Sequence, residues 1–109
     1  MIPTAPLDAV MRTLADPTRR AVLERIIRAE EISVVELTQG SGVTQSAISQ
    51  HLRSLKEAGL IAGRAQGRNV FYRAEPTGLA PLVDWLSHYG DFWRERFAGL
   101  RTLLKDIDP

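Results

Sequence analysis

Apolar residues recur at helical spacing through the first third of the chain. They fall every three or four positions in residues 7–14, which predicts a short helix with one apolar side. Asp16-Pro17 predicts the start of a second helix, because the carboxylate can cap free amides and proline fits the first turn. We expect this second helix to run to about Arg28. Its expected core residues are Ala21, Val22, Leu23, Ile26 and Ile27.

Two further capping signals follow. Ser33 and Glu36 have the spacing of a capping box, which predicts a short helix that begins near Ser33 and ends at Gly40-Ser41-Gly42. Thr44 can cap the next helix, which ends at Ala58-Gly59. Two helices joined by a glycine-containing turn form a helix-turn-helix unit.

The helix over residues 44–58 has an unusual outer face. Its apolar positions lie on one side, and the opposite side carries short or flexible hydrogen-bonding groups, of which only Arg53 is charged. Base edges in a DNA major groove present mixed donors and acceptors, which such side chains can match. We therefore predict that this helix contacts bases, although a solvated polar helix is the alternative. The candidate base-contacting residues are Gln45, Ser46, Ser49 and Gln50.

A basic hairpin is predicted directly after this helix. Leu60–Ala65 and Arg68–Ala74 have the composition of short strands around a turn at Gln66-Gly67. A polar helix followed by a basic hairpin is the order of a winged helix-turn-helix, in which the wing touches the DNA backbone or minor groove. The candidate phosphate or wing contacts are Thr44, His51, Arg53, Lys56, Arg64, Arg68 and Asn69.

The last part of the chain predicts one long helix. Thr77 can cap it, and residues 77–105 would extend roughly 40 Å at ~1.5 Å per residue. Its apolar stripe is wider than one contact surface needs, which favours a helix that also packs on a partner. A helix folded back over a monomer core is the alternative. In the dimer, the terminal helix and residues 7–14 would form the interface. Its predicted residues on the terminal helix are Leu82, Leu86, Tyr89, Trp93, Phe97 and Leu100.

Composition and charge narrow the function. The length of 109 residues predicts one domain, residues 1–109, mainly α with a small β-hairpin. The net charge is only +1, but residues 44–73 hold five basic side chains and one acidic side chain, a balance of +4. Positive charge is therefore concentrated where a phosphate backbone would lie. We expect no cofactor and double-stranded DNA as the partner.

Other classes of protein fit the sequence less well. The chain has no cysteine, which excludes disulfides and thiolate metal sites. It has no glycine-rich phosphate loop, and His51 and His88 lack an evident nucleophilic partner, so no enzyme is predicted. No apolar stretch reaches a membrane span and no signal-peptide pattern is seen, so a cytoplasmic protein is expected. A winged helix that binds a protein instead of DNA stays an alternative.

Four motifs together resemble the ArsR/SmtB family of bacterial repressors. They are residues 14–20 (LADPTRR), 46–52 (SAISQHL), 55–60 (LKEAGL) and 67–72 (GRNVFY). The resemblance covers nearly the whole chain. It implies a homodimeric winged-helix transcriptional regulator, usually an autorepressor that leaves its operator when a signal arrives.

The resemblance leaves the signal open. Family metal sensors often carry cysteines at the positions that are Ser33 and Val35 here, so the arsenic-type site is absent. A second family site uses Asp and His on the terminal helix, and a zinc- or nickel-responsive repressor is therefore an alternative. Against it, only one histidine is present where such sensors use two. The weak candidates, at i, i+4, i+7 and i+11, are Asp84, His88, Asp91 and Glu95.

An organic effector is another possibility. Four aromatic residues near the predicted dimer interface could line an apolar pocket, although aromatic residues at such spacing more often form core. They are Trp85, Tyr89, Phe92 and Trp93. The sequence names neither the effector nor the operator, and it does not separate a repressor from an activator.

Overall fold

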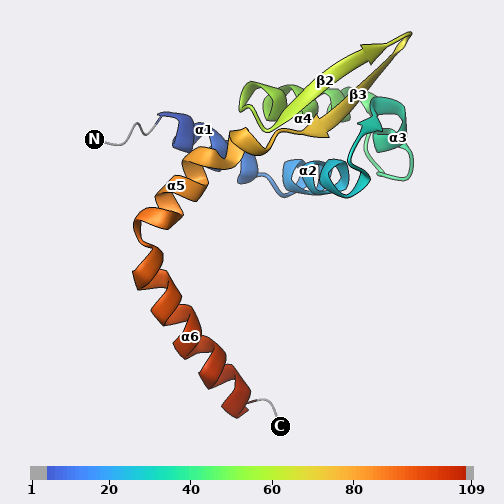
Figure 1. The fold of residues 1–109 in the computed structure, drawn as a ribbon. Helices are drawn as coiled ribbons and strands as arrows, with labels where there is room; N and C mark the ends of the chain where they lie inside the picture. The colour runs from blue at the N-terminus through green and yellow to red at the C-terminus, as the bar shows by residue number, and fades with distance from the viewer. Residues whose placement is uncertain (1–4, 108–109) are drawn as a thin grey trace.

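Residues 5–107 are described by the computed structural model, which shows the winged helix-turn-helix order (Figure 1). The helices and strands up to residue 74 lie together as the body of the molecule, and the last helix, over residues 90–107, extends away from them. The predicted fold class is confirmed. The elements are α1 (Ala5–Leu14), α2 (Pro17–Ala29), β1 (Ile32–Ser33), α3 (Val34–Thr38), α4 (Gln45–Glu57), β2 (Ile61–Gln66), β3 (Asn69–Ala74), a 3₁₀ turn η1 (Pro76–Leu79), α5 (Ala80–His88) and α6 (Gly90–Ile107).

The helices of the body begin where the sequence predicts capping. The Asp16 carboxylate accepts hydrogen bonds from the first amides of α2, the shorter one from Thr18 N at 2.8 Å. Ser33 Oγ accepts from Glu36 N at 3.2 Å at the start of α3. Thr44 begins α4 in the same way. Each cap satisfies an amide that the first helical turn leaves without a partner.

The sheet has one strand more than the sequence predicts. It is antiparallel, with the order β1-β3-β2, and Ile32 pairs with Tyr72. The hairpin turn lies at Gly67-Arg68, since Gln66 pairs with Asn69. The predicted turn at Gln66-Gly67 is therefore wrong by one residue. Gly67 takes a φ of +61°, which a two-residue hairpin turn requires and other residues rarely adopt.

The hydrophobic core lies between α2, α3, α4 and the sheet. Its buried residues are Val10, Val22, Leu23, Ile26, Ile32, Leu37, Ile48, Leu52, Leu55, Leu60 and Ile61. The predicted burial of Ala21 and Ile27 is wrong, and Ile27 is 50% exposed. The face of α2 that meets α4 and β3 centres on Val22 and Ile26. Ala21 and Ile27 lie outside this face.

The predicted single helix over residues 77–105 is interrupted. Thr77 does not cap a helix but lies inside η1, and α5 ends at His88 before α6 begins at Gly90 in a new direction (Figure 1). Glycine is a poor helix former because fixing its free backbone costs more entropy, and here it marks the break. Helix α5 packs on α1.

Gly78 brings the end of the wing close to the end of α4. A Cβ atom at this position would stand 2.1 Å from the carbonyl oxygen of Gly59. Only glycine permits this approach of two backbones. The contact fixes where the chain leaves the winged helix and enters α5.

Candidate nucleic-acid interface

Helix α4 separates an apolar face from a polar face. Ile48, Leu52 and Leu55 are buried on one side. The predicted base-contacting residues Gln45, Ser46, Ser49 and Gln50 are all exposed, as are Arg53 and Lys56. Because the apolar side is fixed in the core, the polar side chains are presented on a rigid support. This arrangement can match the hydrogen-bonding groups of base edges.

His51 occupies a different environment from its polar neighbours on α4. It is half-buried, and it lies close enough to the start of α2 to affect Asp16. The hydrogen bond from Thr18 N lowers the pKa of Asp16 most, and the charges of Arg19 and His51 lower it further. His51 therefore faces α2, and its predicted contact with phosphate stays a prediction.

Arg25 holds the helix-turn-helix together, a role that sequence reasoning missed. Its guanidinium donates to the carbonyl oxygens of Leu37 and Glu36, both at 2.7 Å, and to that of Gln39 at 3.4 Å. Carbonyls at the end of a helix lack partners within the helix, so a cation there supplies both hydrogen bonds and charge. The turn that leads to Thr44 is thereby tied to α2.

The wing is tied to the body by an ion pair. Arg64 Nη2 lies 2.6 Å from Glu31 Oε1, Arg64 Nη1 donates to Gln66 Oε1 at 2.6 Å, and the guanidinium lies over the Phe71 ring. The hydrogen bond from Arg64 lowers the pKa of Glu31. Arg64 was predicted to contact phosphate, but here its charge is matched by Glu31. The Glu31 partner was missed because the two residues lie 33 positions apart.

The other predicted wing contacts lie at the tip of the hairpin and are exposed to solvent. Arg68 and Asn69 are exposed at and beside the turn, and Arg73 is exposed on β3. The wing and the polar face of α4 thus combine basic groups with neutral hydrogen-bonding groups. Basic groups suit the phosphate backbone, whereas neutral donors and acceptors suit the bases.

The four weak metal-ligand candidates do not form a cluster. Asp84 and His88 lie on α5, whereas Asp91 and Glu95 lie on α6 beyond the break. Asp91 pairs with Arg94 at 3.1 Å, and Glu95 lies 3.4 Å from Arg96. Within the described residues, no group of three His, Cys, Asp or Glu side chains could hold a metal ion. The expected single helical face over these residues is therefore wrong.

The four aromatic residues near the break do not form core. They line an apolar hollow of about 340 Å³. Tyr89 and Phe92 are about half exposed, and Trp85 packs edge-on against Tyr89.

None of the helices within residues 5–107 is long and apolar enough to span a membrane.

Known proteins are similar to this chain in sequence and in fold. Residues 14–64 match a family model described as a helix-turn-helix domain. The HTH-type transcriptional regulator Rv2034 of Mycobacterium tuberculosis is 38% identical over 97 residues, which cover 89% of this chain and 87% of the relative. The HTH-type transcriptional repressor SmtB of the same species is 39% identical over 89 residues, which cover 78% and 65%. An ArsR-like transcriptional regulator from Rhodococcus sp. RHA1 superposes with a TM-score of 0.71 at 31% identity, covering 91% and 92%.

The chain belongs to the ArsR/SmtB family. This confirms the resemblance seen in the sequence, and it makes the protein a DNA-binding transcriptional regulator of a non-enzymatic family. In this ArsR/SmtB protein, other residues occupy the two positions at which metal sensors of the family often carry cysteines. Ser33 is buried and caps α3, and Val35 is exposed.

Proposed function

We propose that this regulator is a homodimeric autorepressor that binds an inverted-repeat operator in its own promoter. The observation that carries the proposal is the polar face of α4 beside the basic wing tip. In a two-fold dimer, each α4 would enter a major groove on one face of the duplex. The half-sites would then lie about 34 Å apart, one helical turn, or a multiple of it.

The apolar surface of the terminal helices supports the dimer. No side chain is buried on α5 or on the described part of α6. Phe97 is 54% exposed and Leu100 is 50% exposed, and Met11 on α1 is 42% exposed. Apolar surface of this extent marks an interaction site in a folded protein. The buried Nε1 of Trp93 also lacks a hydrogen-bond acceptor within residues 5–107, and a partner could provide one.

Base contact and phosphate contact can be separated by two substitutions. Gln50→Ala should cost about 1–3 kcal/mol at the operator and flatten sequence preference at one base pair. Arg68→Ala should weaken binding to all sequences similarly and reduce the salt slope by about one. Both are measured by fluorescence anisotropy with operator and random duplexes over a range of salt concentrations.

The same experiment can contradict the assignment. If Gln50→Ala weakened operator and random duplexes equally, the polar face of α4 would not contact bases. A salt-dependent gel shift with the promoter of its own gene tests autorepression. Failure to bind any duplex would favour a winged helix that binds protein instead.

A further inference from the structure

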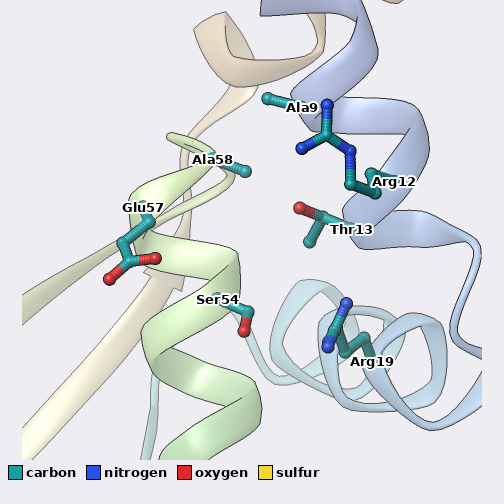
Figure 2. A pocket seen from close by; sticks show the side chains of 7 residues that line it. All are labelled: Ala9, Arg12, Thr13, Arg19, Ser54, Glu57 and Ala58. Carbon is teal, nitrogen blue, oxygen red and sulfur yellow. The ribbon is translucent and has the colours of Figure 1, made fainter.

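A hollow of about 230 Å³ lies between α1, the start of α2 and the end of α4 (Figure 2). Arg12 and Thr13 line it from α1, Arg19 from α2, and Ser54 and Glu57 from α4, and two alanines complete the wall. A water molecule takes ~30 Å³ in the liquid, so the hollow has room for a small ligand of several non-hydrogen atoms. Sequence reasoning did not find this site, because its residues come from three separate helices.

Two guanidinium groups line the hollow, and one of them is paired with a carboxylate. The charge of Arg19 is paired with that of Asp16, whose Oδ2 lies 3.9 Å from Arg19 Nε, but this buried Nε has no hydrogen-bond acceptor within the described residues. Arg12 forms no ion pair in the described part of the chain. Both guanidinium groups face the gap beside α4 in Figure 2, whereas the carboxylate of Glu57 points to the other side of that helix. A buried guanidinium N–H without an acceptor is unfavourable, and an incoming oxygen would satisfy it.

We infer that this hollow binds a small polyvalent oxyanion, in the form of a phosphate or of a short di- or tricarboxylate. Arg12 and Arg19 would hold two of its oxygens by charge-assisted hydrogen bonds. The hydroxyls of Thr13 and Ser54 line the same hollow and can donate further bonds. None of these residues belongs to the proposed base-contacting set on α4, so binding of the anion can be tested without an operator.

Occupation of the hollow connects to DNA binding through α4. Ser54 lies one helical turn after Gln50 on the same rigid helix. A ligand that bridges Arg12 and Arg19 to Ser54 favours one position of α4 relative to α1 and α2. A ligand shifts affinity only if it binds one such position better than another. We therefore expect the anion to change operator affinity as well as to bind.

The test is an ¹⁵N–¹H NMR titration of the full chain without DNA. Citrate and inorganic phosphate are the two probes, with sodium chloride added to keep the ionic strength constant. Saturable shifts are expected at the amides of Arg12, Arg19 and Ser54, and the tighter probe identifies the source of the oxyanion. Arg12→Gln should weaken its affinity at least about tenfold, because one of two charged donors is lost. The matched control is Arg28→Gln, an exposed arginine on α2, which should bind as the unaltered protein does.

Three results would overturn the inference. One is the absence of saturable shifts with either probe, and another is equal affinity of the unaltered protein and Arg12→Gln. The third comes from operator binding at constant ionic strength. If Arg12→Gln lowered the salt slope while neither probe bound, the arginines would be DNA phosphate contacts. Because the titration contains no DNA, a failed operator assay would not affect its result.

Discussion

Replacement of Arg25 tests how the helix-turn-helix is held in place. Arg25→Met keeps the aliphatic stem but removes the donors to the carbonyl oxygens of Glu36 and Leu37. Hydrogen bonds from a charged group contribute about 1.5–3 kcal/mol each when buried. Arg25 is half-buried, and water can replace part of the loss, so we expect the free energy of unfolding to fall by about 1–3 kcal/mol in total.

Urea unfolding at a fixed protomer concentration measures this change, because dimerisation would otherwise alter the apparent stability. Arg28→Met is the control, since Arg28 is exposed and lies one turn further along α2. Operator affinity should also fall in Arg25→Met, as the turn before α4 loses its anchor. A free energy of unfolding within about 0.5 kcal/mol of the control would refute the role of Arg25.

Three further predictions address the close backbone contact, the wing and the dimer. Gly78→Ala should lower the free energy of unfolding by about 1–3 kcal/mol in a thermal scan, because its Cβ meets a backbone carbonyl; Gly99→Ala, with open space around it, should not. The ion pair with Arg64 lowers the pKa of Glu31, so it should hold the wing at full strength when the pH is above the ordinary pKa of 4.5. It should release the wing as the pH falls through the lowered pKa. An NMR titration of the Glu31 carboxyl should show its pKa return toward 4.5 in Arg64→Gln, and an unchanged midpoint would argue against the ion pair. Leu100→Glu should give a monomer in sedimentation velocity at micromolar concentration, and a persistent dimer would count against the α6 interface.

The sequence by itself determined the local elements of the winged helix. Capping depends on residues only two or three positions apart, so Asp16, Ser33 and Thr44 fix helix starts without help from the rest of the chain. The faces of α4 follow from helical periodicity, which is also local. The base-contacting candidates could therefore be predicted, because an apolar side that must be buried leaves the other side exposed.

Tertiary structure decided what depends on distant residues. Arg25 meets the turn 11 to 14 positions away, and Arg64 meets Glu31 across 33 positions. Charged side chains of this kind look like ordinary surface residues in the sequence, since nothing local shows which carbonyl or carboxylate folding brings to them. The break at Gly90 belongs here too, because a glycine within a helical pattern is tolerated or not according to how the flanking segments pack.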